Sequence, residues 1–158
     1  VIYDIMNGGL RELRKELGNR TAKIRKIDDE LSLAICERII QIIKEEAKTI
    51  DYNDEMYLAV TMDNQIIKTE KGYRVINTNQ ASTYSEFGTG MVGSQNPHPN
   101  PMGWEYDVNE HGIKGWRYNV GGMWYFTRGV PSNPVYLSSA QRVRTEIPSM
   151  IKERFGDK

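Results

Sequence analysis

Apolar residues recur at gaps of three and four between residues 24 and 43. This spacing places them on one face of a helix. The pattern therefore predicts a helix over residues 21–49, about 43 Å long at ~1.5 Å per residue. A shorter helix over about residues 9–17 is predicted before it. Gly18 and Asn19 have the chemistry of a helix C-terminus and predict a break between the two helices.

The period changes from helical to alternating after residue 50. Apolar side chains occupy every second position over residues 56–62, which predicts a β-strand. Asp63-Asn64 then predicts a tight turn, and residues 65–69 and 73–78 predict two further strands around a turn at 70–72. Connections this short cannot make crossovers, so we expect the strands to be antiparallel.

Aromatic residues concentrate in residues 84–134, which hold nine of the fifteen in the chain. Residues 91–115 within this segment have no helical or strand period and are rich in glycine and proline. They predict a loop of unusual length, and such loops are commonly functional. Residues 116–120 and 123–127 alternate again and predict a hairpin that turns at the two glycines between them.

A helical stripe returns near the C-terminus. Asn133 followed by Pro134 predicts the start of a helix, and Pro148 predicts a kink or an end to its first half. The predicted fold class is α+β: an antiparallel sheet of four to six strands, flanked by the long N-terminal helix and the C-terminal helix. We expect one domain over residues 1–158, with a long loop insertion at 91–115.

Composition narrows the function classes. The chain has 158 residues, 21 basic and 21 acidic side chains, and one cysteine. Zero net charge argues against attraction of the whole surface to nucleic acid or membrane. No apolar run approaches the ~20 residues of a membrane span, and no signal peptide is recognised at the start. A single cysteine excludes an internal disulfide and a cysteine-rich zinc site.

Candidate catalytic chemistry is sparse. The two histidines, His98 and His111, lie in the 91–115 loop near three carboxylates, Glu105, Asp107 and Glu110. A metal or acid–base site there is conceivable, but a solvated polar loop is the favoured interpretation. No phosphate-binding loop or nucleophile elbow is present. We therefore expect no enzyme activity, no catalytic or metal-binding residues and no cofactor; a hydrolase that uses the histidines is the alternative.

The aromatic residues have two interpretations. They can fill the core beneath a sheet, or they can anchor an interface, since tryptophan and tyrosine dominate binding hot spots. We expect Phe87, Trp116 and Trp124 to point inward and Trp104 and Tyr106 to lie at an interface. A platform for single-stranded nucleic acid would need interleaved basic residues, and residues 88–110 contain none.

Two motifs resemble a known family. The first runs Tyr84-Ser85-Glu86-Phe87-Gly88-Thr89-Gly90, and the second runs from Trp124 to Leu137 and includes Gly129, Pro131, Pro134 and Tyr136. Their order, between two helical regions, resembles the tail-completion, or neck, proteins of long-tailed bacteriophages, which join head to tail. Two features depart from that family. Residues 49–60 lack the glycine usual after the first helix, and Val135 replaces an aromatic residue, with Tyr136 one place later.

The resemblance implies a structural protein of the virion, assembled in the host cytoplasm. Copies would form a homo-oligomeric ring of six subunits between the portal or head-closure connector proteins and the tail tube or tail terminator protein. DNA would pass through the lumen without sequence readout, and no membrane would be involved. In this role Glu86 is expected on the rim facing a neighbouring subunit. The acidic 91–115 loop is expected to contact the next ring or the lumen.

Further roles remain open for the chain. Within the same class it can be a tail terminator or a minor tail protein. In another class it can be a sequence-independent DNA-binding protein that uses the basic residues near the C-terminus. These are Arg117, Arg128, Arg142, Arg144, Lys152 and Arg154. Such binding would weaken steeply with added salt.

Overall fold

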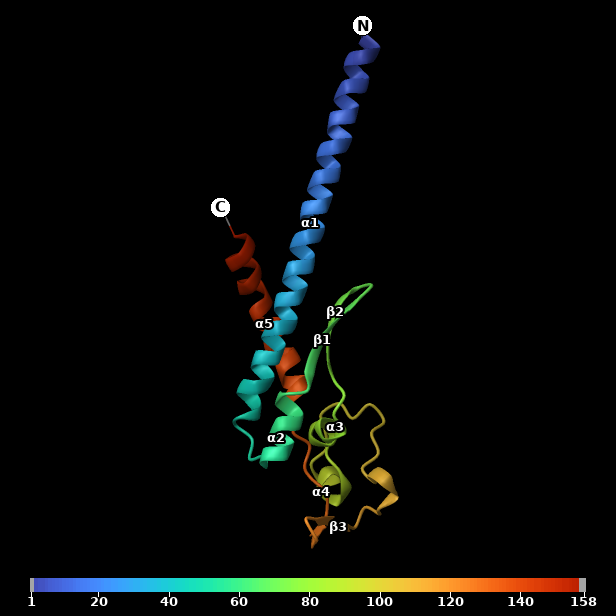
Figure 1. The fold of residues 1–158 in the computed structure, drawn as a ribbon, viewed down its shortest axis with the longest axis vertical. Helices are drawn as coiled ribbons and strands as arrows, with labels where there is room; N and C mark the ends of the chain where they lie inside the picture. The colour runs from blue at the N-terminus through green and yellow to red at the C-terminus, as the bar shows by residue number, and fades with distance from the viewer. Residues whose placement is uncertain (1, 157–158) are drawn as a thin grey trace.

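One helix runs through most of the length of the molecule. The computed structural model describes residues 2–156, and the side chains from residue 12 onward except those of residues 54 and 155. Helix α1 (Ile2–Ala47) has 46 residues, which corresponds to about 69 Å at ~1.5 Å per residue. Figure 1 shows its N-terminal half standing clear of the other elements, while its C-terminal half lies among them.

The break predicted at Gly18 is wrong, because α1 continues through it. Two contacts cross the glycine: Arg20 pairs with Glu16 at 2.5 Å, and the Thr21 hydroxyl donates to the Leu17 carbonyl at 2.9 Å. A glycine inside a helix costs only about 1 kcal/mol relative to alanine. The good helix formers around Gly18 outweigh that cost.

The strand predicted over residues 56–62 is also wrong. Helix α2 (Asp54–Thr61) occupies this position, and Asn53 caps it by accepting the Met56 amide at 2.8 Å. Ala59 and Val60 are buried at consecutive positions, which a strand with one buried face does not allow. Met56, Ala59 and Val60 have the helical spacing of three and four, and the cap selects the helix.

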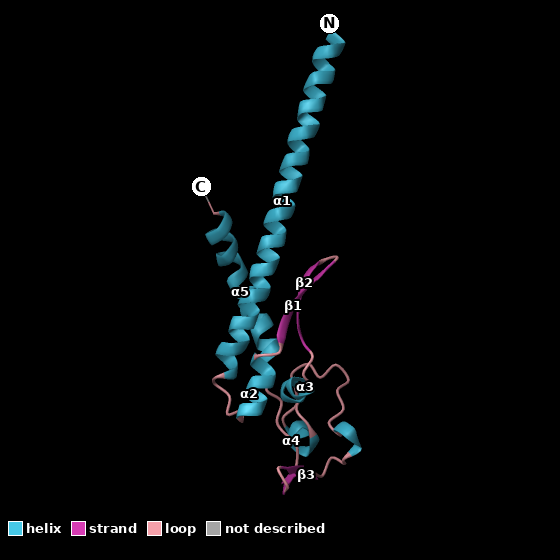
Figure 2. Ribbon diagram, viewed as in Figure 1, coloured by secondary structure: helices cyan, strands magenta, loops and turns pink. Residues whose placement is uncertain are grey.

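The strands form two small sheets instead of one sheet of four to six. β1 (Asn64–Thr69) pairs antiparallel with β2 (Gly72–Asn77), and β3 (Trp116–Val120) pairs antiparallel with β4 (Met123–Thr127). The α+β class and the antiparallel pairing are as predicted, with the turns at 70–72 and 121–122 where expected. The hairpin turn predicted at Asp63-Asn64 is wrong, because a helix precedes it and Asn64 begins β1. Figure 2 shows the two hairpins at separate places in the molecule, so no common sheet exists for the helices to flank.

The predicted 91–115 loop is partly helical and closely folded. Helix α3 (Gln80–Phe87) leads into the short helix α4 (Gly90–Gln95), which includes the first residues assigned to the loop. A 3-10 turn, η1 (Val108–Glu110), lies near its end. The intervening chain bends back over α3 and α4, as described below. Figure 1 shows these elements and β3 gathered at the end of the molecule opposite the N-terminus.

Helix α5 (Val135–Phe155) returns along α1 in the antiparallel sense. Pro148 lies inside α5 and does not end it. Charged side chains join the two helices: Arg38 donates to Glu146 at 2.6 Å and to Glu45 at 2.9 Å, and Arg142 donates to Glu45 at 2.6 Å.

The apolar core lies where α1 ends, α2 crosses and α5 begins. Its fully buried members are Ile43, Ala47, Val60 and Val135. Partly buried aromatic side chains, including Tyr52 and Tyr136, pack around them. Within residues 2–156, no helix has both the length and the apolar character needed to cross a membrane.

Candidate functional site

The two motifs that carry the family resemblance are hydrogen-bonded to each other. The Thr89 amide donates to the Val130 carbonyl at 2.9 Å, and the Val130 amide donates to the Thr89 hydroxyl at 3.2 Å. The Asn133 amide donates to the Ser85 carbonyl at 2.8 Å. Segments about forty residues apart in sequence thus form one joint, which we call the motif joint: residues 84–93 together with 128–136.

Glycines allow this close approach. Gly129 has φ of +98°, and a Cβ there would overlap the carbonyl of Thr89. At Gly90, a Cβ would lie 2.5 Å from the Arg128 carbonyl oxygen. Neither position has room for a side chain, and both have backbone angles that favour glycine. The glycines of the two motifs are therefore explained by one contact between backbones.

Glu86 holds the start of α5. Its side chain is 8% exposed. Oε2 accepts the Tyr136 amide at 2.9 Å and Oε1 accepts the Leu137 amide at 3.0 Å. Pro134, the residue just before α5, makes no side-chain hydrogen bond that caps this helix. A carboxylate on the free amides of a helix N-terminus satisfies them and opposes the helix dipole. The expectation that Glu86 lies on an exposed rim is wrong, because its carboxylate is buried against the first turn of α5.

His98 links the long loop to the same carboxylate. The imidazole is buried, its Nε2 lies 3.2 Å from Oε1 of Glu86, and its Nδ1 contacts the backbone of Asn100. Its ring also packs on Phe87, with centroids 4.7 Å apart. His98 therefore fixes the proline-rich turn against α3 and the start of α5.

Two more aromatic residues of the loop cover the first motif. The Trp104 indole donates to the Gly88 carbonyl at 2.8 Å and stacks on Phe87 with centroids 5.1 Å apart. The Gly90 amide donates to the Tyr106 carbonyl at 2.7 Å. Both side chains are half-buried. The loop thus packs over the motif joint. An interface role for Trp104 and Tyr106 stays a prediction.

Tyr136 connects the motif joint to the apolar core through hydrogen bonds of its hydroxyl. Its hydroxyl donates to the Val60 carbonyl at 3.2 Å and accepts from the Asn77 amide group at 2.9 Å. Burial is the main cause that raises the pKa of Tyr136 to about 12. Burial also raises the pKa of Tyr52, whose hydroxyl lies 2.6 Å from that of Ser85. Both phenols are neutral structural groups around neutral pH.

The prediction that Trp124 points inward is wrong, since this side chain is 70% exposed. It lies on the β3–β4 hairpin, which leads directly into residue 128 of the motif joint, and its neighbours on both faces of the hairpin are exposed too. We call these exposed residues together the hairpin surface. Its members are the exposed apolar residues of the two strands: Tyr118, Val120, Met123, Trp124, Tyr125 and Phe126. A patch of this composition is typical of protein–protein contacts.

The remaining site residues fall into place around the joint. Tyr84 is half-buried, with its ring 6.3 Å from that of Trp104. Pro131 is exposed beside the joint, and Pro134 directly precedes α5. Trp116, expected inside, is half-buried and stacks on His111.

The structure separates the groups of the hydrolase alternative. His98 binds Glu86, whereas His111 stacks on Trp116 with centroids 5.5 Å apart. Among the side chains that the structure describes, no three His, Cys, Asp or Glu residues are grouped so that they could hold a metal ion. Of the basic residues in the DNA-binding alternative, Arg142 is engaged in the contact between α1 and α5.

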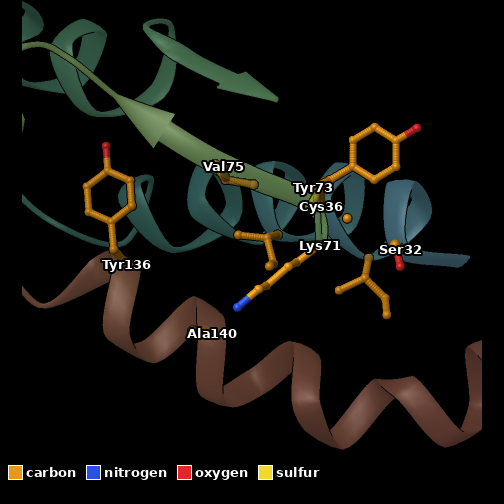
Figure 3. Close-up of a pocket in the computed structure, with 10 residues that line it drawn as sticks. Ser32, Cys36, Lys71, Tyr73, Val75, Tyr136 and Ala140 are labelled. Carbon is orange, nitrogen blue, oxygen red and sulfur yellow. The ribbon is translucent and has the colours of Figure 1, made fainter. Parts of the chain in front are cut away.

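Figure 3 shows a cavity of about 420 Å³ between α1, β2 and α5. Ile35, Cys36, Val75 and Ala140 line it, and Lys71 is the charged residue of its lining. Burial is the main cause that raises the pKa of the Cys36 thiol. The thiol is thus kept protonated, as expected for a small buried apolar side chain.

Sequence reasoning found the motif residues but missed their mutual contact. Nothing local in the sequence indicates that Glu86 accepts amides fifty residues away. The signal that exists is Pro134, which immediately precedes α5 and has no side-chain oxygen to accept the free amides of the first turn. Such a helix needs an acceptor from elsewhere in the chain.

Comparisons with known proteins returned no match, whether the chain was set against protein-family models, curated proteins or solved structures.

Proposed function

We propose that this chain is a structural protein of the neck of a long-tailed bacteriophage, a tail-completion protein. Copies of it would form a ring of six between the head connector and the tail tube. The observation that carries the proposal is the motif joint. The two motifs that resemble family signatures in the sequence are in contact in the structure, and their glycines and their glutamate take part in that contact.

The joint suits such a role because it is rigid. The amides of Thr89 and Val92 donate to the carbonyls of Val130 and Arg128, and Glu86 fixes the direction in which α5 leaves. The β3–β4 hairpin extends directly from this joint. A ring repeats one contact many times, and it closes only if each copy presents its surface at the same angle.

The hairpin surface is the proposed contact with a neighbouring subunit or with the next ring. It exposes one tryptophan, two tyrosines and one phenylalanine on two short strands. Aromatic side chains of this kind contribute most of the binding energy at interfaces. The acidic loop beside it, with Glu105, Asp107 and Glu110 exposed, would repel DNA and let it slide through a channel.

The test uses a phage that carries this sequence. Trp124→Ser with Phe126→Ser is expected to leave the thermal midpoint of the purified chain unchanged, because both side chains are exposed. The same variant is expected to accumulate separate heads and tails in lysates, seen by electron microscopy. Ile151→Ser, an exposed apolar residue on α5, is the matched control and should still yield joined particles.

Two results would contradict the proposal. One is the absence of the chain from purified, infectious particles by mass spectrometry. The other is normal joining of heads and tails when the gene is deleted. The position of its density along the particle axis separates a neck ring from a tail terminator or a minor tail protein.

A further inference from the structure

The free half of α1 carries an apolar stripe that nothing in the described chain covers. Every side chain from residue 12 to residue 26 is exposed. Leu13, Leu17 and Ile24 are 51%, 54% and 66% exposed. The stripe follows alternating gaps of three and four, the a and d positions of a heptad. We call it the heptad seam: Leu13, Leu17, Arg20, Ile24, Ile27 and Leu31.

The seam continues into an interface that the fold already contains. The next positions at the same spacing are Ala34 and Arg38, and α5 covers both: Ala34 lines a cavity with Met150, and Arg38 binds Glu146. Residue numbers fall along α5 as they rise along α1, so this covering helix is antiparallel. Figure 1 shows that α5 diverges from α1 toward its C-terminus and leaves the N-terminal half of α1 standing alone.

We propose that the free half of α1 binds the same segment of a second copy of this chain, as an antiparallel helix pair. A stripe with heptad spacing fits another helix with the same spacing, because each side chain inserts between those of the facing helix. In this pair the second copy covers the free half of the seam, as α5 covers its continuation at Ala34 and Arg38.

Charge selects the register. With Leu17 opposite Arg20 of the second copy, Leu13 lies opposite Ile24 of the second copy. Glu16 and Lys23 both flank the seam at g positions, and in this register each Glu16 faces Lys23 of the second copy. The two-fold symmetry makes this contact twice. Charges beside the seam are known to set orientation and partner choice in such helix pairs.

Competing arrangements bring like charges together. Shortening the overlap by one heptad places Glu16 against its own equivalent and Arg14 against its own equivalent. Lengthening it by one heptad places Lys23 against its own equivalent. A parallel pair in register places Arg20 against Arg20. In the proposed register, Arg20 packs its aliphatic stem on Leu17 and keeps its 2.5 Å ion pair with Glu16 of the same helix.

This pairing goes beyond the proposed neck function and does not depend on it. An antiparallel pair has a two-fold axis across its helices, which a single cyclic ring lacks. The dimer therefore belongs to the protein free in solution. The overlap between residues 10 and 27 is about 27 Å long at ~1.5 Å per residue, so the association is modest and depends on concentration.

Sedimentation equilibrium of the full chain tests the pairing. The unmodified chain is expected to pass from monomer to dimer with increasing concentration. Leu17→Glu with Ile24→Glu should remain a monomer without loss of thermal stability, because both positions are exposed. The control is Lys15→Glu with Ala22→Glu, which places charges on the opposite side of the helix and should dimerise normally. A monomeric unmodified chain, or a dimer that the seam variant retains, overturns the proposal.

Charge exchange tests the antiparallel register. Glu16→Lys and Lys23→Glu should each weaken the dimer roughly ten-fold, since two attractive pairs become two repulsive ones. The two changes together should recover most of the affinity. In a parallel pair, Lys23→Glu would face Asp28 and no recovery would follow. A double variant no tighter than the weaker single variant overturns this register. Either failure leaves the neck proposal standing, because that proposal is tested on particles.

Discussion

Glu86 is the residue on which most of the joint depends. It is a buried carboxylate that accepts two amides of α5 and contacts His98. Such a group is stable inside a protein only when its oxygens are fully engaged. The sequence alone suggested a surface contact for Glu86. The environment instead assigns it to the positioning of a helix.

We expect Glu86→Ala to destabilise the fold by about 2–4 kcal/mol, because it leaves buried amides and an imidazole without their acceptor. Glu86→Gln retains one acceptor oxygen and should cost about half as much. Urea unfolding followed by circular dichroism measures both. An alanine variant within about 0.5 kcal/mol of the unmodified chain would show that α5 does not need this cap.

Gly129 predicts a second effect at the residue scale. Gly129→Ala should destabilise by more than about 2 kcal/mol, since the added carbon meets the Thr89 carbonyl in addition to the strain of positive φ. Gly103→Ala is the matched control: φ is +80° there, and no described atom lies within 4 Å of the added carbon. Its cost should be about 1 kcal/mol, from backbone strain alone. Equal costs in urea unfolding would mean that the close approach is not tight.

The α1–α5 pair gives a prediction at the scale of elements. Hydrogen bonds from Arg38 are the main cause that lowers the pKa of Glu45 and Glu146. A carboxylate with a lowered pKa in the folded state stabilises the fold at neutral pH. That contribution is lost as the pH falls from the ordinary value of 4.5 through the lowered pKa. We therefore expect part of the acid sensitivity of the fold to come from this pair.

Arg38→Met tests this. It keeps the stem that packs between the helices and removes the charge. The variant should have a lower thermal midpoint at pH 7, and the difference from the unmodified chain should shrink as the pH is lowered below about 4.5. Lys26→Met, whose ammonium pairs with Glu30 on exposed surface at 3.8 Å, is the control and should show little effect at any pH. A difference for Arg38→Met that is independent of pH would contradict the assignment.

The elements also show how far the sequence determines the fold. Periodicity predicted α5 and both hairpins, although the apolar residues of the β3–β4 hairpin are exposed on both of its faces. It failed at residues 56–62, because two members of the alternating set, Met56 and Val60, also lie four residues apart on one face of a helix. It failed at Gly18, where local glycine chemistry suggested an end but contacts between Glu16 and Arg20 continue the helix. The loop could not be predicted, since His98 and Trp104 take their places from residues distant in sequence.

At the scale of the whole molecule, stability and exposed binding surfaces are separated. The core and the motif joint hold the fold, whereas the hairpin surface and the free half of α1 lie outside both. Variants of the last two should therefore change association without changing stability. This separation suits a protein that must fold alone and then join a larger assembly.

Hydrogen exchange along α1 makes this separation measurable. In the Leu17→Glu/Ile24→Glu monomer, amides of residues 12–26 should exchange orders of magnitude faster than those of residues 34–47. The former are held by helix propensity alone and the latter by the buried core. In the unmodified chain at high concentration, protection should extend into residues 12–26, because opening the helix then requires breaking the pair. Equal protection of both halves in the monomeric variant would mean that the free half is stabilised within its own chain. The heptad seam would then be protected without contact to a second copy.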